Sequence, residues 1–532
     1  MTSFPQHRPV TLARRGIVAA PHYLAAEAGL EILKTGGNAI DAAIAASATL
    51  QVVYPFVCGL GGDVFMLIYD AKSGELYGLN GSGRSAQMAT IERYRELGYT
   101  TMPVFGIHTV TVPGCASGWD AAIQRFGRLG LAQALAPAIS YAEEGFAIGP
   151  GLHAALAAGS VRTEIHRSWH KHFLPNGAVP PVGAVVRFPN LARTLHAIGK
   201  GGSETFYHGE IADQMAAFFA QEGGLITRED LAAHQSEWVK PLSVPFADLR
   251  IYELPPNTQG ITALQMLGIL NQLQLGEDAL APETVHLSVE AKKLAFADRA
   301  AYLTDAAHMR VDPTAFIEPD YLAQRRALID PERAQPSFDP GSFTGDTIYL
   351  CTADRDGNVV SLIQSNYMGF GSGVVVDDTG IVLQNRGAYF SLEPTAANAL
   401  APAKRTLHTL IPSMALRDGR PAMVFGTMGG DGQPQIHLQV YTAVARFGLN
   451  IQQAIEMPRW IHGDTPGGET LLVESRFPPA TLDTLRRLGH RVQEHGMWSS
   501  TMGYAQGIVF DPSTGVMQGG SDPRAEGIAA GW

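Results

Sequence analysis

The sequence has few cysteines, no long apolar run and no excess of basic residues. Three cysteines occur singly in 532 residues, at positions 58, 115 and 351, and none forms a Cys-x-x-Cys pair. This usage is typical of a reducing compartment and disfavours structural disulfides and thiolate metal sites. No segment offers the roughly 20 consecutive apolar residues of a membrane helix. The net charge of −11 makes nucleic acid an improbable partner.

The N-terminal stretch lacks the features of an export signal. Arg14 and Arg15 are not followed by an apolar segment of useful length, so we predict no secretory signal and a cytoplasmic location. The chain is 45% hydrophobic and 17% charged, which predicts a large buried core in one or two domains. Its 58 glycines and 33 prolines indicate many tight turns.

The pattern along the chain changes near residue 346. Residues 22–53 predict two helices separated by Gly36 and Gly37, with Asn38 as the cap of the second helix. The segment "TVPGCASGWDAAIQRFG" predicts a strand, a turn and a helix. Residues 325–346 predict a loop, and the rest predicts hairpins around Asp-Gly turns, the first being "TIYLCTADRDGNVVSLIQS". Helices segregated from hairpins favour an α+β fold with sheets sandwiched between helices.

Thr347 lies where the predicted loop meets the first hairpin. A threonine at the start of a strand is usually structural, since β-branched residues favour strands. A threonine also becomes a nucleophile when a free N-terminal amine acts as its base. That function requires cleavage between Asp346 and Thr347, which the loop would tolerate.

Two further patterns allow structural and functional interpretations. "GTMGGDGQPQ" lacks the spacing of a nucleotide-binding loop; it suits a tight turn or, less often, an oxyanion hole made of backbone N–H groups. His166, His170 and His172 lie close together, but a solvated segment is the better interpretation than a metal site. Asp522 and Arg524 in "DPRAEG" suggest a structural ion pair or turn. We predict no metal and no cofactor.

Taken together, the segments resemble the γ-glutamyltransferase family of N-terminal nucleophile hydrolases. The matching stretches run in family order and cover nearly the whole chain: "GGNAIDAA", "GLGGDVFMLIY", "VPGCASGW", "HLSVEAKKLAFADRAAYL", "GDTIYLCTADRDGNVVS", "FGSGVVVDDTGIVLQN", "TMGGDGQPQ" and "SDPRAEGIAAG". The resemblance implies a four-layer αββα sandwich made as one precursor. It implies self-cleavage into residues 1–346 and 347–532, which stay associated as one composite catalytic domain.

The resemblance also assigns roles to residues. Thr347 is the implied nucleophile, Ser365 the second hydroxyl residue beside it, and Gly429 and Gly430 the implied oxyanion hole, which outweighs the structural interpretation of that turn. A small-molecule amide is the implied substrate. Whether the product associates further, as a dimer of heterodimers, stays open.

The substrate pocket departs from the family pattern. Tyr389 replaces an acidic residue that binds the substrate's ammonium group, Arg386 replaces a polar residue, and Tyr367 replaces an asparagine. His408 and Thr409 stand for a pair of serines, and Arg84 lies two residues beyond Ser82, which occupies the place of a carboxylate-binding arginine. These departures resemble the oxamate amidohydrolase-like subgroup. They predict that Arg386 or Arg84 binds a substrate carboxylate.

Three hypotheses follow. The first is a self-cleaving amidohydrolase that acts on a small carboxylate-bearing amide such as oxamate, or on a γ-glutamyl amide such as glutathione, by hydrolysis or transfer. The second is an acylase of the same fold acting on a cephalosporin-type side chain. The third is a non-catalytic binding module that keeps the fold.

Overall fold

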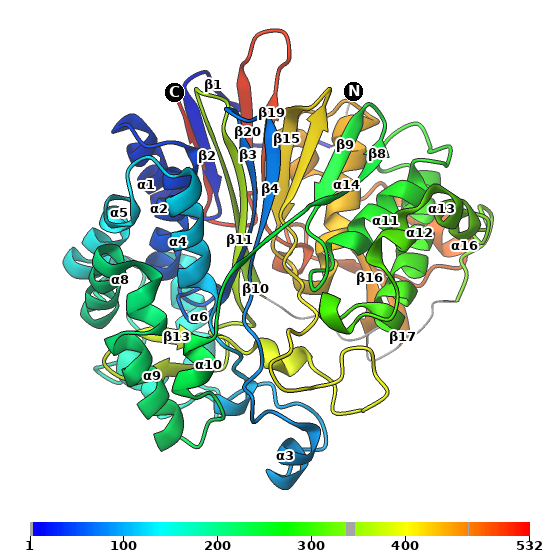
Figure 1. The fold of residues 1–532 in the computed structure, drawn as a ribbon. Coiled ribbons are helices and arrows are strands. Elements are labelled where there is room, and N and C mark those ends of the chain that lie inside the picture. Colours follow the sequence, from blue (N-terminus) through cyan, green and yellow to red (C-terminus); the bar gives the residue numbers. More distant parts are fainter. Residues whose placement is uncertain (1–3, 337–345, 466–467) are drawn as a thin grey trace.

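Two seven-stranded sheets lie face to face at the centre of the molecule (Figure 1). The computed structural model describes residues 4–336, 346–465 and 468–532. The first sheet has the strand order β1 (Thr11–Ala13), β20 (Met517–Ser521), β19 (Ala505–Phe510), β15 (Arg420–Thr427), β14 (Ser413–Arg417), β9 (Leu249–Glu253) and β8 (Leu242–Phe246). The second has the order β21 (Ile528–Gly531), β2 (Gly16–Ala20), β10 (Asp346–Asp354), β11 (Val359–Tyr367), β3 (Asp63–Asp70), β4 (Glu75–Gly81) and β7 (Glu237–Val239).

Helices cover the outer face of each sheet (Figure 1). The second sheet carries α1 (Tyr23–Lys34), α2 (Ala39–Val53) and α4 (Cys115–Phe126), with α5 (Leu131–Glu144) and α8 (Pro189–Tyr207) outside them. The first sheet carries α11 (Gly260–Leu270), α14 (Gln433–Ala445) and α15 (Ile451–Glu456), with α12 (Pro282–Tyr302) packed against α11. The predicted four-layer sandwich is therefore confirmed.

Shorter elements surround these layers. The remaining helices are α3 (Ile91–Glu96), α6 (Pro150–Ser160), α7 (Arg167–Phe173), α9 (Glu210–Gln221), α10 (Arg228–Ala232), α13 (Pro319–Arg326) and α16 (Pro479–Arg487). Three small sheets join β5 (Phe146–Ala147) with β6 (Val185–Val186), β12 (Val374–Val376) with β13 (Ile381–Leu383), and β16 (Trp460–Thr465) with β17 (Gly468–Glu474) and β18 (Val492–His495). Among the described helices, none is long and apolar enough to cross a membrane.

Hydrophobic cores fill the three spaces between the four layers. Along β10, Ile348 and Leu350 belong to the core beneath α2, whereas Tyr349 and Cys351 belong to the core between the sheets. This alternation follows from the two-residue period of a strand. Both faces of β11 are covered as well, and all of its residues are buried, including the polar Ser361, Gln364, Ser365 and Asn366.

Most of the predicted local structure is present. Gly36, with φ of 108°, ends the first helical segment, and Asn38 caps α2 through hydrogen bonds from Ile40 and Asp41. The predicted strand before α4 is wrong. Residues 110–114 form no strand, because Pro113 lacks an N–H and Val112 donates to the Arg84 carbonyl outside any ladder.

The predicted loop before Thr347 is only partly described. Helix α13 ends at Arg326, and residues 327–336 contain neither helix nor strand. Residues 337–345 lie outside the described part of the chain. Asp346 already belongs to β10, so the strand begins one residue before the predicted cleavage product.

Candidate active site

Thr347 and Ser365 meet at the end of the β10–β11 hairpin. Both side chains are buried, and the Thr347 hydroxyl donates to Ser365 Oγ over 3.1 Å. Ser365 Oγ also accepts the backbone N–H of Tyr367 at 2.7 Å. The hairpin thus fixes one hydroxyl as the acceptor for the other, and it brings together two residues that were predicted to act together.

The strand beside this hairpin approaches it unusually closely. A Cβ atom on Gly62 would lie 2.3 Å from the Ser365 carbonyl oxygen, so only glycine fits immediately before β3. Asp63, the next residue, is the register partner of Ser365 across the β3–β11 pair. The sequence "GLGGD" therefore places a carboxylate next to the Thr347–Ser365 pair.

The predicted oxyanion turn follows β15. Gly429 and Gly430 have φ angles of 132° and 52°, which favour glycine. Gln259 donates from Nε2 to the Gly430 carbonyl and to the Thr409 carbonyl, each at 2.9 Å. Arg299 in turn donates to Gln259 Oε1 at 2.6 Å and also pairs with Asp431. A buried polar network therefore fixes the carbonyl side of this turn.

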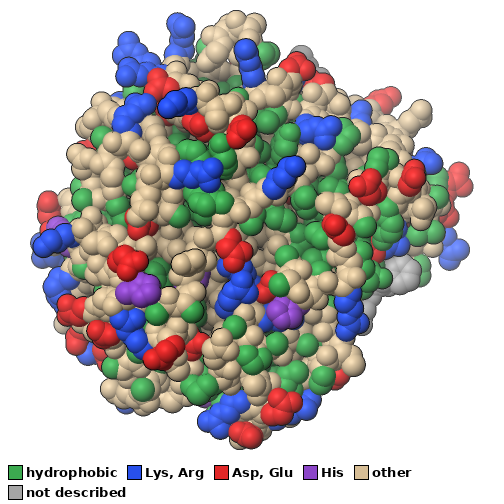
Figure 2. All heavy atoms as spheres, viewed as in Figure 1, with side chains coloured by type: hydrophobic (Ala, Val, Ile, Leu, Met, Phe, Trp, Pro, Cys, Tyr) green, Lys and Arg blue, Asp and Glu red, His purple; other side chains and the backbone are tan. Residues whose placement is uncertain are grey.

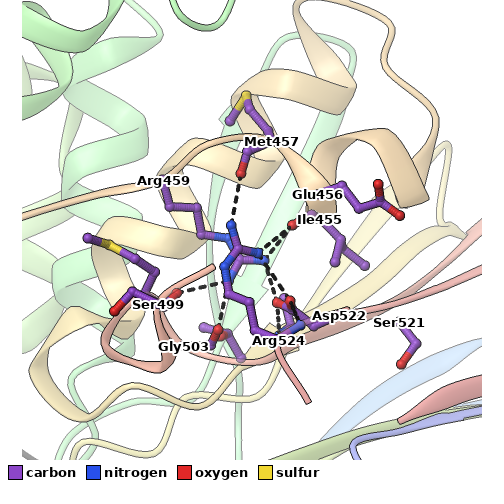
Figure 3. A network of polar contacts seen from close by, with 12 residues as sticks. Ile455, Glu456, Met457, Arg459, Ser499, Gly503, Ser521, Asp522 and Arg524 are labelled. Atoms are coloured by element: carbon purple, nitrogen blue, oxygen red, sulfur yellow. Dashed lines mark hydrogen bonds and ion pairs between the residues drawn. The ribbon is translucent and has the colours of Figure 1, made fainter. Parts of the chain in front are cut away.

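A second buried network supports the loop packed against the turn (Figure 3). Gly503 lies next to Gly429, and its carbonyl accepts Arg459 Nη1 at 3.0 Å. Arg459 is paired with Asp522 at 2.7 Å, and Asp522 with Arg524 at 3.1 Å. The predicted structural ion pair of Asp522 and Arg524 is confirmed, as part of this larger network.

Arg386 is a buried cation with unused donors. Its Nη1 donates to the Thr409 hydroxyl at 3.1 Å, and its guanidinium carbon lies 4.0 Å from the centre of the Tyr367 ring. Nε and Nη2 are buried and have no hydrogen-bond partner among the described residues. Leaving buried charged donors unpaired is costly, so this position favours an anionic ligand.

Tyr367 and Tyr389 connect the hairpin to the glycine turn. Their ring centres are 5.7 Å apart in an edge-to-face arrangement, and the Tyr389 hydroxyl donates to Asp431. Burial raises the pKa of both phenols well above the usual range, so both are neutral. Arg299 and Tyr389 both donate to Oδ1 of Asp431, so the charge of this carboxylate is already paired with Arg299.

His408 forms a buried pair with Asp63. His408 Nε2 lies 2.9 Å from Asp63 Oδ2 in a fully buried pair. Burial and the charge of Arg386 hold the pKa of His408 well below its usual range. Burial raises the pKa of Asp63 to about 7, and the charge of Arg386 acts in the opposite direction.

Four site residues were not predicted from the sequence: Asp63, Gln259, Arg299 and Asp431. Asp63 and Asp431 lie inside glycine-rich stretches that were singled out, so a carboxylate within such a turn is a signal that could have identified them. Gln259 follows a Pro-Pro turn, and Arg299 lies on a largely buried helix where a cation needs a partner. Their partners come from distant segments and have no local signal.

Arg84 lies apart from the chain of contacts that joins Thr347 to Gly430. It pairs with Glu237 and with Asp305, each at 3.2 Å. It lines a cavity of about 460 Å³, and Thr347 is not among the residues lining this cavity. Its guanidinium thus already has two carboxylate partners, of which Glu237 is shared with Arg405.

One described group has the composition of a metal site. The ligand atoms of His286, Glu290 and His490 lie within 4.8 Å of one another. The two histidines hydrogen-bond each other at 2.8 Å, however, and Glu290 pairs with Lys293 at 2.7 Å. The cluster is therefore satisfied without a metal. His166, from the predicted histidine group, pairs with Glu222 instead.

Comparison with known proteins decides the family. The family model described as Gamma-glutamyltranspeptidase matches residues 25–532. The chain belongs to the γ-glutamyltranspeptidase family. It is therefore an enzyme of the N-terminal nucleophile hydrolase type, whose nucleophile is a threonine.

Relatives of this chain within the γ-glutamyltranspeptidase family are named for different activities. The chain is 41% identical to the oxamate amidohydrolase proenzyme of Klebsiella pneumoniae and 39% identical to the glutathione hydrolase-like YwrD proenzyme of Bacillus subtilis; each match covers 98% of this chain and 99% of the relative. A solved cephalosporin acylase from Bacillus halodurans is 43% identical, with a TM-score of 0.93, covering 100% of this chain and 98% of that one.

Proposed function

We propose that this chain is a self-cleaving amidohydrolase that hydrolyses a small carboxylate-bearing amide through a Thr347 acyl-enzyme. The observation that carries the proposal is the line of contacts from Thr347 through Ser365, Tyr367, Arg386, Thr409 and Gln259 to Gly430. It joins a nucleophile, an anion-binding group and a glycine turn within one buried site. These are the groups that acyl transfer requires.

Self-cleavage would begin with attack of Thr347 Oγ on the Asp346 carbonyl carbon. The Asp346–Thr347 C–N bond breaks as the amine leaves with a proton, which gives an ester on Thr347. Water then hydrolyses the ester, releasing the Asp346 carboxylate and leaving Thr347 with a free α-amine and a free hydroxyl. The hydrogen bond to Ser365 would orient Oγ before and after this step.

Turnover would repeat the same chemistry on an external amide. Thr347 Oγ attacks the substrate carbonyl while the new α-amine accepts its proton, and the N–H groups at Gly429 and Gly430 stabilise the oxyanion. The amine then protonates the leaving nitrogen, and an ester forms. Water resolves the ester to the acid and regenerates the enzyme.

Arg386 supports the choice of an anionic substrate. Its two unpaired nitrogens can form a bidentate pair with a carboxylate, while the pairs that Arg84 already makes disfavour Arg84 for this role. The names of the relatives cover oxamate, glutathione and cephalosporin substrates, so the substrate is proposed from the site: a carboxylate close to the scissile amide.

A comparison of two products tests the proposal. The purified enzyme is incubated separately with oxamate and with glutathione, and ammonia and glutamate are measured. Faster ammonia release from oxamate, absent in Thr347→Ala, supports the proposal. Glutamate release alone would favour a γ-glutamyl hydrolase. Release of neither product, together with an uncleaved chain, would favour the binding module.

A further inference from the structure

The Arg386–Thr409 pair joins two separate segments of the chain. Arg386 begins η4 (Arg386–Tyr389), a single 3-10 turn, and Thr409 lies in residues 404–411, which belong to no helix and no strand. Arg386 Nη1 donates to the Thr409 hydroxyl at 3.1 Å. Neither segment is part of a sheet ladder or a long helix, so other contacts must fix the guanidinium relative to its partner.

Asn398 supplies such contacts. Its Nδ2 donates to the Tyr389 carbonyl and to the Thr406 hydroxyl, each at 2.8 Å. Its Oδ1 accepts the Leu407 N–H at 3.0 Å and the Thr304 hydroxyl at 3.1 Å. A backbone carbonyl can only accept and a backbone N–H can only donate, so the orientation of this amide is fixed. The side chain thus makes all four hydrogen bonds that an amide can make.

The partners of Asn398 belong to both segments. Tyr389 ends the turn that Arg386 begins, and Leu407 lies two residues before Thr409. One side-chain amide therefore bridges the segment of the guanidinium and the segment of its hydroxyl partner. Neither segment can shift relative to the other without breaking at least one of these hydrogen bonds.

Residues 404–411 are also anchored on their other side. The His408 N–H donates to the Asn257 carbonyl at 2.8 Å, and the Gln259 N–H donates to the His408 carbonyl at 2.9 Å. The side chain of Gln259 holds the Gly430 carbonyl of the glycine turn. Gln259 thus connects the glycine turn to residues 404–411, and Asn398 connects residues 404–411 to η4.

We propose that Asn398 is a positioning residue for the substrate carboxylate: by joining η4 to residues 404–411, it holds the unpaired nitrogens of Arg386 at a fixed separation from the glycine turn. A fixed separation favours an amide whose carboxylate lies at one set distance from the scissile carbonyl. Asn398 acts through Arg386 and takes no part in bond making or breaking. This inference rests on the proposed function, because it requires a substrate carboxylate at Arg386.

A double-mutant cycle tests this role. Steady-state kinetics with oxamate are measured for the wild type, Asn398→Ala, Arg386→Gln and the double variant. Asn398→Ala should raise KM about 5- to 20-fold, with a smaller change in kcat and with self-cleavage at the wild-type rate, because self-cleavage uses no substrate carboxylate. In the Arg386→Gln background the same substitution should raise KM by less than about twofold, because the group that Asn398 positions is already gone.

Two further variants separate positioning from general damage. Asn358→Ala is the matched control, since Asn358 accepts the Ala71 N–H at 3.1 Å and donates to Asp354 at 2.8 Å at the turn of the β10–β11 hairpin. It should leave KM unchanged. Thr406→Val removes one partner of Asn398 and keeps the shape of the side chain, so it should raise KM about 2- to 5-fold even if Asn398→Ala does not fold.

Some outcomes would overturn the inference. It is wrong if Asn398→Ala raises KM by the same factor in the wild-type and Arg386→Gln backgrounds. It is also wrong if neither Asn398→Ala nor Thr406→Val changes KM in an enzyme that hydrolyses oxamate. Absence of oxamate hydrolysis by the wild-type enzyme, or an unchanged KM in Arg386→Gln, counts instead against the proposed function on which the inference rests.

Discussion

The Thr347 hydroxyl donates a hydrogen bond to Ser365 Oγ over 3.1 Å, between β10 and β11, two strands joined by one tight turn. Removing this acceptor should leave Thr347 Oγ free to rotate away from the attacking direction. We expect Ser365→Ala to slow both self-cleavage and amide turnover by about 10- to 100-fold. A gel time course measures the rate of self-cleavage, and ammonia release measures the rate of amide turnover.

Ser361→Ala is the control for Ser365→Ala. Ser361 lies on the same strand and bonds only Tyr349 among its described side-chain partners. Equal slowing by both variants would contradict the role of Ser365.

Arg386 should govern affinity for the anionic substrate. Arg386→Gln removes the charge and the bidentate fork, so we expect KM for oxamate to rise about 10- to 100-fold, with self-cleavage intact. Steady-state kinetics measure the change. Arg84→Ala should alter KM little, because Arg84 is already paired with two carboxylates. The reverse result, a raised KM only in the Arg84 variant, would move the carboxylate site to the cavity that Arg84 lines.

Gln259 should matter for the rate rather than for affinity. Its amide holds the Gly430 and Thr409 carbonyls, so Gln259→Leu should let the glycine turn relax and lower kcat by about tenfold or more with a smaller change in KM. Gln265 lies on the same helical segment but bonds Asp298, and Gln265→Leu serves as the control for general damage. A higher KM at unchanged kcat in Gln259→Leu would mean that the residue acts on substrate binding instead.

The Arg459–Asp522 pair should contribute to stability. Arg459→Met leaves Asp522 with one arginine instead of two in a fully buried place, and we expect about 3–5 kcal/mol lower free energy of unfolding in urea. Burial raises the pKa of Asp522, but the two arginines and the backbone N–H groups outweigh it and lower the pKa below its usual value. The stability gained from its ionisation is therefore present above the ordinary carboxyl range and is lost as the pH falls. An Arg459→Met variant with the same urea midpoint of unfolding as the wild type would show that the pair adds nothing to stability.

Local patterns predicted much of the fold. The Asp-Gly turn of the first hairpin and the Asn38 cap each depend on neighbours within a few residues, and both are present. The strand predicted before α4 was wrong, because apolar β-branched residues there pair with no neighbouring strand.

The site was predictable only where its residues lie in recognisable motifs. Thr347, Ser365 and the Gly429–Gly430 turn could be named in advance, and the structure joins them through a continuous line of contacts. The Asp63–His408 pair joins residues 345 positions apart, and no periodicity reveals such a pair. Nor could the sequence separate Arg386 from Arg84, since only folding shows which guanidinium keeps unpaired nitrogens.

The central claim is that Thr347 becomes an N-terminus and attacks the substrate. Intact-mass analysis of the purified protein, with N-terminal sequencing of the smaller species, tests it most directly. We expect two chains, 1–346 and 347–532, with the smaller one beginning at Thr347, and a single uncleaved chain without amide turnover for Thr347→Ala. An uncleaved wild-type chain that hydrolyses amides, or a smaller chain that begins at another residue, would contradict the claim.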